Sequence, residues 1–320
     1  MTKQLRLLIL RYDNIGDLVC TTPLIAALRE YFPRAWIGAL VNTYNAEVLT
    51  RNTMLDEVFV HEKKKHSSKW FIELVINYIN MVLSIRRLCL DVVIVPTAQW
   101  VRFANILGAS KVIVVPDNLP SEMHEVERTF ETARELGITC RPGKMYVFPD
   151  PAVVEIVKNK LGTKPFVVIH ISARRVKQRW PLERYAALAC ELAQNHKVVL
   201  MWSPGPSNDP CHPGDDVNIV KILKLVKSSP HCDNIIPLPT LNLVTLIAAM
   251  SLASLVICPD GGTVHLAAAL GKPVVALFGD SPVTRWRPWG VKHKVVQFDD
   301  FENLTLDLVL ASIREIESTE

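Results

Sequence analysis

The stretch "VICPDGGTVHLAAALGKPVVALFG", residues 256–279, contains two apolar runs that flank a glycine turn and an alanine-rich helical pattern. Continuous apolar runs are typical of parallel β-strands, because helices cover both faces of such a sheet. An apolar run, a turn, a helical pattern and a second apolar run in this order predict a β-α-β unit with Asp260 at the end of its first strand. Backbone N–H groups at such a helix N-terminus commonly bind anions, so this turn is a candidate ligand site.

The same alternation extends along the rest of the chain. In the first half, helices are predicted to start near Ile15, Lys69 and Trp100, and strands are predicted at residues 5–10, 35–40, 57–61, 91–96 and 111–116. The pattern becomes irregular and proline-rich over residues 137–163. It then resumes with strands predicted at residues 165–172, 197–203, 234–238, 254–258, 273–279 and 294–298.

These patterns predict an α/β protein of two Rossmann-like domains, residues 1–150 and 151–320. We expect two parallel sheets whose strand C-termini face each other across a cleft, because open α/β sheets bind ligands outside those ends. The last helical pattern, residues 304–319, could pack back on the N-terminal domain.

The composition limits the class of protein. The 320 residues are 49% hydrophobic, and a formal net charge of +4 is too weak to indicate nucleic-acid binding. A mildly basic chain does suit an anionic substrate or an anionic membrane surface. Seven cysteines occur singly, which favours buried, reduced thiols in a cytosolic protein over a disulfide framework or a zinc site.

Neither a signal peptide nor a membrane span is expected from the sequence. Charge returns at Arg11 and Asp13 after only a short N-terminal apolar run. The pattern closest to a span, residues 70–85, is interrupted by Glu73 and two asparagines. We therefore expect a soluble or at most peripheral protein.

The turn Asp260-Gly261-Gly262-Thr263 is suited to a diphosphate. Its glycines allow tight turning and close approach, and the helix N-terminus attracts negative charge. Asp260 itself would repel phosphate, so sugar hydroxyls, a backbone amide or a metal are its better partners. An ordinary structural role is equally open, in which Asp260 caps the helix and His265 packs inside it.

A basic loop follows the strand predicted at residues 165–172. It contains four cations, Arg174, Arg175, Lys177 and Arg179. Pro181 suits the first position of the helix that comes next. Such runs are usually solvated, but this one follows a strand of the same predicted domain as Asp260, so it could also contact phosphate.

The first predicted strand is followed by "RYDNIGD" and a helix, a segment that supplies Arg11, Asp13, Asn14 and Asp17. The glycine fingerprint of dinucleotide-binding proteins is absent, which disfavours hydride transfer on this fold. Asp17 lies near the helix N-terminus, where a carboxylate stabilises the helix dipole. It could instead be a general base that deprotonates an acceptor hydroxyl, a role worth roughly 10²–10⁴-fold in rate.

A second basic run, "HEKKKHSSKWF" at residues 61–71, also follows a predicted strand. A solvated loop is the more ordinary interpretation. Its cations Lys63, Lys64, Lys65 and Lys69 lie beside Trp70 and Phe71, a mixture that would suit a phosphorylated glycolipid at an anionic membrane. Arg102 starts another helix after a strand and could face the same cleft.

Three of these segments resemble glycosyltransferase family 9, the lipopolysaccharide heptosyltransferases of GT-B fold. They are "IGDLVCTTPLIAAL" near the N-terminus, "RWPLERYAAL" after the basic loop, and "PDGGTVHLAAALGKPVVALFG" near the C-terminus. The resemblance covers nearly the whole chain, with one long motif in each half.

The resemblance implies inverting transfer of L-glycero-D-manno-heptose from ADP-heptose to a lipopolysaccharide core acceptor. By the same resemblance, the N-terminal domain, residues 1–150, binds the acceptor and the C-terminal domain, residues 151–320, binds the nucleotide-sugar donor. Asp17 then matches the candidate general base and Asp260 the residue that holds the donor sugar. The donor phosphate turn comprises Gly261, Gly262, Thr263 and His265, while Arg11, Asp13, Asn14, Lys63, Lys64 and Arg102 are candidates for acceptor binding. No cofactor or metal is required, although a divalent ion at Asp260 is compatible. The expected location is the cytoplasm, with peripheral contact to the inner face of the inner membrane.

The chain departs from the family pattern at three places. Gln178 stands where a lysine is usual, which leaves Lys177 or Arg179 as the donor-loop cation. Gly261 replaces a threonine or serine, and "DSPVTRWRPWG" at residues 280–290 replaces the usual continuation. Two alternatives therefore stay open, a glycosyltransferase that uses another nucleotide sugar and a non-catalytic protein that binds one.

Overall fold

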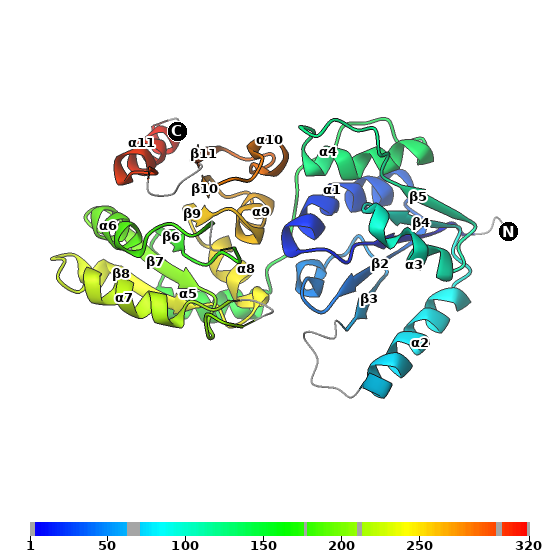
Figure 1. Cartoon of the computed structure of the whole chain (residues 1–320), viewed down its shortest axis with the longest axis horizontal. Coiled ribbons are helices and arrows are strands. Elements are labelled where there is room, and N and C mark those ends of the chain that lie inside the picture. Colours follow the sequence, from blue (N-terminus) through cyan, green and yellow to red (C-terminus); the bar gives the residue numbers. More distant parts are fainter. Residues whose placement is uncertain (1–3, 63–70, 176–177, 210–212, 299–302, 319–320) are drawn as a thin grey trace. The chain divides into compact units, whose positions relative to one another are not determined.

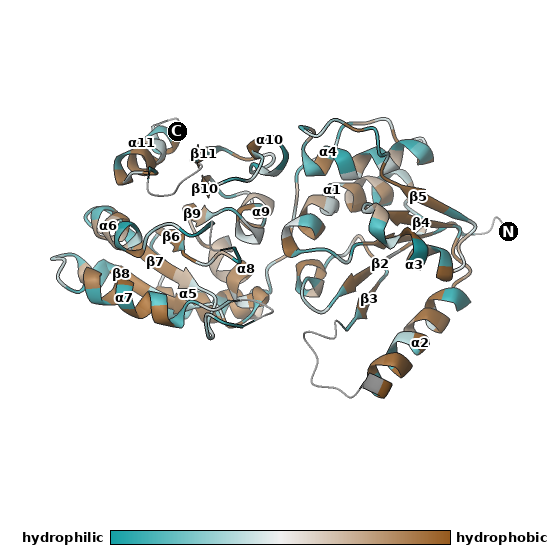
Figure 2. Ribbon diagram, viewed as in Figure 1, coloured by the Kyte–Doolittle hydropathy of each residue, from teal (hydrophilic) through white to brown (hydrophobic). Residues whose placement is uncertain are grey.

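The computed structural model describes residues 4–62, 71–175, 178–209, 213–298 and 303–318. The chain divides into two compact units, Met1–Phe148 and Pro149–Glu320. Each unit consists of one parallel sheet layered between helices (Figure 1). Most strands of both sheets are hydrophobic along their length (Figure 2), as the continuous apolar runs predict.

In the described part of the first unit, five parallel strands have the order β3-β2-β1-β4-β5. The strands are β1 (Arg6–Leu10), β2 (Trp36–Asn42), β3 (Glu57–His61), β4 (Val92–Val95) and β5 (Lys111–Val114). The helices are α1 (Ile15–Tyr31), α2 (Phe71–Arg87), α3 (Val101–Ile106) and α4 (Glu125–Phe130). Short 3-10 turns occur at η1 (Ala46–Leu49), η3 (Ala98–Trp100) and η4 (Glu131–Leu136).

Side chains of β1 alternate between the two faces of this sheet, and both faces are buried. Leu8 and Leu10 belong to a cluster that includes Val82 and Ile85 of α2. Their neighbours Leu7 and Ile9 are fully buried as well. The strand is therefore covered on both sides, which is why its sequence is apolar at every position.

Helix α1 contains Pro23, which has no N–H to donate to the carbonyl four residues earlier. The hydroxyl of Thr22 donates to that carbonyl, Val19 O, over 2.7 Å instead. Thr22 Oγ1 also accepts the N–H of Tyr146 over 3.1 Å, at the end of the first unit. The Thr-Pro pair in "TTP" thus keeps the helix continuous beyond the proline.

In the described part of the second unit, six parallel strands have the order β11-β10-β9-β6-β7-β8. The strands are β6 (Phe166–His170), β7 (Lys197–Trp202), β8 (Ile235–Pro239), β9 (Leu255–Pro259), β10 (Val274–Phe278) and β11 (His293–Gln297). The helices are α5 (Pro151–Leu161), α6 (Leu182–Leu192), α7 (Asp216–Val226), α8 (Leu243–Ser251), α9 (Gly262–Ala269), α10 (Val283–Trp286) and α11 (Leu306–Glu317), with η6 (Cys232–Asn234) before β8.

Each predicted strand is found within one or two residues of its expected position, but other expectations were wrong. Helix α5 lies inside residues 137–163, where only an irregular connection is expected; its N-cap Asp150 accepts the N–H groups of Ala152 and Val153. Pro181 is the N-cap of α6 and not its first residue. Cys89 and Cys140 are exposed, whereas buried thiols are expected.

Helix α11 packs on β11, β10 and α6 of its own unit. No helix in the described residues is both long and apolar enough to cross a membrane.

Candidate active site

Both sheets have a switch point, where the chain reverses the direction in which it adds strands. In the first unit it lies between β1 and β4, and in the second between β6 and β9. Ligands of open α/β sheets bind outside the strand C-termini at such points. The segments that follow these four strands are therefore the candidate site segments.

Arg11 directly follows β1, and its side chain is buried, with 1% of it exposed. Nη2 donates to Glu125 Oε1 over 2.6 Å and to Asp17 Oδ1 over 3.3 Å. Nη1 donates to Thr97 Oγ1 over 3.0 Å. Burial alone would lower the pKa of Arg11, but the carboxylates of Glu125, Asp17 and Asp13 raise it. The guanidinium is thus the charged centre of this group of carboxylates.

Asp13 is held by the segment after β4. Its Oδ2 accepts the hydroxyl of Thr97 over 2.6 Å, and its Oδ1 accepts Gln99 Nε2 over 3.0 Å and Trp100 Nε1 over 3.3 Å. Asp13 Oδ2 also lies 3.3 Å from Arg11 Nε. The two segments that flank the first switch point are therefore joined through one carboxylate.

Asp17 is the third residue of α1, as the sequence predicts. Its Oδ2 accepts both the backbone N–H and the side-chain amide of the N-cap Asn14, each over 3.1 Å. The side chain remains 16% exposed. Arg11 and Asn14 therefore fix the orientation of the Asp17 carboxylate, which remains accessible to a substrate hydroxyl.

The environment of Asp17 favours its protonated form. Burial raises its pKa, and the negative charges of Glu125 and Asp13 raise it further, against the opposing effects of Arg11 and the Asn14 N–H. A general base works best when its pKa approaches the working pH. The direction of the shift therefore suits a carboxylate that accepts a proton.

Two buried asparagines hold the backbone of the loop between β1 and α1. Asn42 Nδ2 donates to Tyr12 O over 2.7 Å and to Asp13 O over 3.2 Å. Asn45 Nδ2 donates to Arg11 O over 3.3 Å, and its Oδ1 accepts Asn42 N over 3.0 Å. The loop carbonyls are thus satisfied inside the protein, which fixes the directions of the loop side chains.

An aromatic cluster lies next to this loop. The ring of Tyr12 contacts His61, Trp100 and Phe103 at centroid distances of 5.2, 5.0 and 5.4 Å. Tyr78 of α2 contacts His61 at 5.6 Å and Phe103 at 5.7 Å. The cluster connects the site segments after β1 and β4 with α2.

Asp260 directly follows β9 in the second unit, and 6% of it is exposed. Its Oδ2 accepts Gln178 Nε2 over 2.6 Å, and the hydroxyl of Ser281 also hydrogen-bonds this carboxylate. Gln297 Nε2 donates to Gly279 O and Ser281 O, each over 2.9 Å, and so holds the Ser281 segment.

Burial raises the pKa of Asp260, and Asp280 raises it further. Ser281, Gln178 and the charge of Arg175 act in the opposite direction. Arg175 is exposed and lies in the segment after β6. The second switch point therefore combines an acidic side chain with a cation that is open to solvent.

The turn after Asp260 exposes backbone at the start of α9. Gly261 has φ of +155° and ψ of −167°, a conformation that side chains rarely adopt. Gly261 is exposed and Gly262 half-buried, whereas Thr263 and His265 are buried. His265 contacts the ring of Trp286 in a T-shaped arrangement, with centroids 5.9 Å apart. Backbone N–H groups, more than the side chains, are thus presented at this turn.

Arg179 is occupied inside the second unit. Its Nε donates to Ala173 O over 3.0 Å, and its Nη1 lies 3.3 Å from Asp215 Oδ1. Asp215 is 2% exposed, so this ion pair anchors the loop between β6 and α6 to a buried carboxylate. The geometry gives Arg179 a loop-holding role, whereas Arg175 is exposed and its charge acts on Asp260.

Four further predicted site residues are not tested by the contacts described above. Arg102 is exposed near the start of α3. Lys177, Lys63 and Lys64 lie outside the described residues. The predicted roles of these four side chains stay predictions.

Sequence reasoning missed Glu125 and the Thr97–Gln99–Trp100 group. Glu125 is the first residue of α4, far along the chain from β1, and no local pattern marks it. The segment after β4 does carry a signal, because it follows a predicted strand just as "RYDNIGD" does. Gln178 is noted only as a departure from the family pattern, whereas the structure makes it a direct partner of Asp260.

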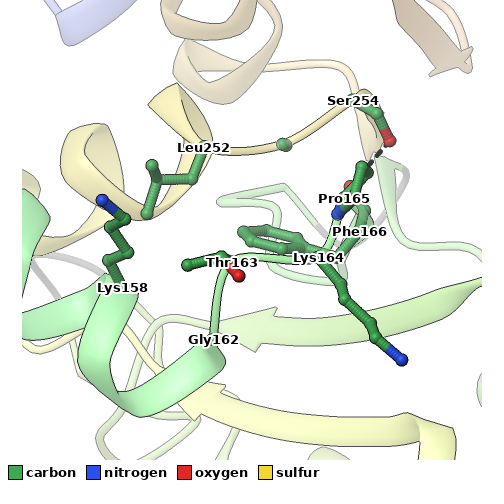
Figure 3. Close-up of a pocket in the computed structure, with 9 residues that line it drawn as sticks. Lys158, Gly162, Thr163, Lys164, Pro165, Phe166, Leu252 and Ser254 are labelled. Atoms are coloured by element: carbon green, nitrogen blue, oxygen red, sulfur yellow. Dashed lines mark hydrogen bonds between the residues drawn. The ribbon is translucent and has the colours of Figure 1, made fainter.

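A cavity of about 300 Å³ in the second unit lies away from these segments. It is lined by Lys158, Lys164, Phe166 and Ser254, among others, at the strand ends where β6 and β9 begin. In Figure 3 the ammonium groups of Lys158 and Lys164 point in opposite directions, and the Ser254 hydroxyl donates to Phe166 O over 2.9 Å. Among the described residues, no group of three His, Cys, Asp or Glu side chains is arranged to hold a metal ion.

A family model described as glycosyltransferase family 9 (heptosyltransferase) matches residues 108–305, more than half of the chain. The chain belongs to glycosyltransferase family 9. Its predicted enzyme class, a glycosyltransferase, is thereby confirmed. The matched range includes the Asp260 turn and Gln178 but not Asp17.

Similar proteins cover most or nearly all of this family 9 glycosyltransferase. Lipopolysaccharide heptosyltransferase 3 of Escherichia coli is 23% identical over 88% of this chain and 85% of its own length. A family 9 glycosyltransferase from Veillonella parvula has a TM-score of 0.80 at 18% identity, covering 98% and 97% of the two chains. The E. coli heptosyltransferase WaaC with ADP has a TM-score of 0.79 at 18% identity, covering 98% and 100%. The predicted α/β fold of GT-B type is confirmed.

Proposed function

We propose that this enzyme transfers L-glycero-D-manno-heptose from ADP-heptose to a lipopolysaccharide core acceptor. The printed names of its relatives support this substrate class, since the E. coli relative is a lipopolysaccharide heptosyltransferase. A heptosyltransferase of the same fold was solved with ADP-2-deoxy-2-fluoro heptose. The reaction would take place in the cytoplasm, at the inner face of the inner membrane.

The observation that carries the chemical proposal is the environment of Asp17. An oriented, partly exposed carboxylate with a raised pKa is suited to take the proton of an acceptor hydroxyl. The acceptor oxygen then attacks the anomeric carbon, while the bond to the diphosphate breaks on the opposite face. One base and one displacement give inversion, with no covalent intermediate on the enzyme.

The donor half of the proposal uses the second switch point. An ionised carboxylate has about four lone-pair positions, and Asp260 uses two of them for Gln178 and Ser281. The other positions can accept sugar hydroxyls. Backbone N–H groups at the start of α9 and the charge of Arg175 would stabilise the departing diphosphate.

We propose that transfer needs no metal, because Arg175 and the α9 N-terminus supply positive charge for the leaving group. Activity in the presence of excess EDTA tests this point. Full activity supports it, and loss that Mg²⁺ restores would contradict it.

A second candidate donor is favoured by one observation. Gln178, a neutral side chain, contacts Asp260 where the family usually has a lysine nearby, and it changes the polar surface around the donor sugar. The same mechanism with another nucleotide sugar is therefore the alternative. A non-catalytic binding protein is less well supported, because both Asp17 and Asp260 are present.

Calorimetric titration with ADP, ADP-heptose, GDP-mannose and UDP-glucose separates these candidates. Selective binding of ADP and ADP-heptose, followed by transfer to core acceptor, supports the proposal. Preference for a different nucleotide sugar would move the function to another glycan. Donor binding without turnover on any acceptor would leave only the binding protein.

A further inference from the structure

Gln178 belongs to a group of three polar side chains at neighbouring strand ends of the second unit. Its Nε2 donates to Asp260 Oδ2 over 2.6 Å and lies 3.5 Å from Ser281 Oγ. The Ser281 hydroxyl also hydrogen-bonds Asp260. The three residues follow β6, β9 and β10, which are adjacent in the sheet (Figure 1). Their side chains therefore meet at the edge where open α/β sheets bind ligands.

The two residues after Gln178 anchor the segment that carries it. Arg179 pairs with the buried carboxylate of Asp215. Trp180 is 1% exposed, and its Nε1 donates to Leu304 O over 2.8 Å. Gln178 itself is 8% exposed. The side chain of Gln178 is thus held in one direction before any ligand arrives, which lowers the entropy that binding would cost.

The amide of Gln178 has a donor end and an acceptor end. An ionised carboxylate only accepts hydrogen bonds, so Nε2 is the end that faces Asp260. The carbonyl oxygen, Oε1, is the other end, and it accepts no hydrogen bond from the residues that the structure describes. Polar atoms of buried side chains normally have a partner, because lost hydration is costly. A ligand that donates a hydrogen bond would therefore be favoured at Oε1.

A sugar hydroxyl has the chemistry that Oε1 requires. Asp260 keeps lone-pair positions for one hydroxyl, and Gln178 Oε1 can accept a second one beside it. Two acceptors side by side match two neighbouring hydroxyls of a sugar ring. A fully ionised phosphate does not suit this pair, because its oxygens only accept. Lysine, which is usual in the family at this position, only donates, so Gln178 introduces an acceptor where the family pattern has none.

We propose that Gln178 determines donor specificity, because its carbonyl oxygen accepts a hydroxyl of the donor sugar next to the hydroxyl that Asp260 accepts. The inference rests on the proposed function in one respect, that the second unit binds a nucleotide sugar, but it does not depend on which one. Donor sugars that lack either hydroxyl are disfavoured, because a buried acceptor then stays unsatisfied.

Calorimetric titration of the full chain tests this inference through one ratio, the Kd of a nucleoside diphosphate divided by the Kd of its nucleotide sugar. The pairs are ADP with ADP-heptose, GDP with GDP-mannose, and UDP with UDP-glucose. Effects on the diphosphate cancel, so the ratio reports the sugar contacts. Gln178→Lys keeps a donor toward Asp260 and removes the acceptor, whereas Gln178→Met removes both. Both variants should lower the ratio for the preferred donor by about 3- to 10-fold, the contribution of one neutral hydrogen bond.

Gln194→Lys is the charge-matched control, since Gln194 is exposed in the same unit, and it should keep the wild-type ratio. An unchanged or higher ratio in Gln178→Lys would overturn the inference, because Gln178 would then only hold Asp260. Failure of the proposed function gives a different result. Wild type would then prefer GDP-mannose or UDP-glucose, and the ratio for that donor would still fall in both Gln178 variants. A wild-type ratio near one for all three pairs would contradict both.

Discussion

The Arg11 guanidinium and the Glu125 carboxylate lie 2.6 Å apart, although 114 positions separate them in the chain. Their side chains are 1 and 5% exposed. Asp17 Oδ1 lies 3.3 Å from Nη2 of the same guanidinium. The charge state and reactivity of Asp17 therefore depend on a residue from a distant helix, and this relationship yields the first prediction.

Glu125→Gln should shift the pH dependence of transfer. Glu125 raises the pKa of Asp17, so removing its charge lowers that pKa and leaves Arg11 to pair more strongly with Asp17. The acid limb of the kcat/KM profile should move to lower pH, because Asp17 stays ionised further into the acid range. The base would also be weaker, so the plateau rate should fall. A profile that keeps its midpoint would contradict the coupling.

Asp17→Asn should lower kcat/KM by roughly 10²–10⁴-fold, because the general base is lost. Donor affinity in calorimetry should stay close to the wild-type value, because Asp260 and the α9 turn are unchanged. Normal turnover in the Asp17→Asn variant would remove Asp17 from the mechanism. Asp13→Asn is the comparison variant, since Asp13 is engaged with Thr97, Gln99 and Trp100 and should lose less.

Asp260→Asn should stabilise the protein at neutral pH. The folded pKa of Asp260 is raised, so the native state holds a proton that the unfolded state releases between the ordinary pKa of about 3.9 and the raised value. Native stability therefore falls as the pH rises through that window, and the amide avoids this cost. Thermal melts should show a Tm a few degrees above wild type at pH 7, with the gap closing as the pH falls. A gap that widens toward acid would reverse the assigned sign.

Gly261→Ala should destabilise the second unit by roughly 1–3 kcal/mol, the usual cost of a side chain in a sparsely populated backbone conformation. Space is not the cause, because a Cβ at Gly261 would meet no atom within 4 Å. Gly143→Ala is a matched control: a Cβ there also meets nothing, and its φ is ordinary. Denaturant unfolding of both variants checks the difference, and equal losses would argue against backbone strain at the turn.

Thr22→Val should cost more stability than Thr21→Val. Thr22 supplies the bond that Pro23 cannot make to Val19 O, and it also accepts the Tyr146 N–H. Losing it leaves the buried Val19 O and the partly buried Tyr146 N–H unsatisfied, and a fully buried group left in this way costs about 1–3 kcal/mol. Thr21 donates to Asp17 O, as a supplement to the helix. Equal midpoints in urea unfolding for the two variants would show that the proline is compensated in another way.

Local patterns were sufficient to predict much of this protein. The central strands coincide with continuous apolar runs, because helices of the same unit bury them on both faces. Asp17 and Asp260 could be chosen as candidates because each lies between a predicted strand and the helix that follows it, or in the first turn of that helix. Helix α5 was missed, since a capping Asp150 and Pro151 are equally typical of a loop when the preceding segment is irregular.

The partners of these residues could not be predicted in the same way. Sequence proximity brings Asn14 to Asp17, but Glu125 reaches Arg11 and Gln178 reaches Asp260 only after the strands have taken their order in the sheets. Likewise, the apolar pattern of a helix does not show which of its side chains will pack against the sheet. Only the fold showed that Ile72, Ile76 and Ile79 of α2 are exposed.

The sequence by itself determined the alternation of strands and helices, the family, and the two acidic residues at the helix mouths, because these depend on backbone propensity and side-chain burial within short segments. Only the tertiary structure decided that carboxylates surround Arg11. It also decided that Arg179 pairs with the buried Asp215 while Arg175 is exposed, and that α2 has exposed apolar side chains. The enclosure of Arg11 arises from strand order, which brings Glu125 within hydrogen-bonding distance although it lies 114 positions away.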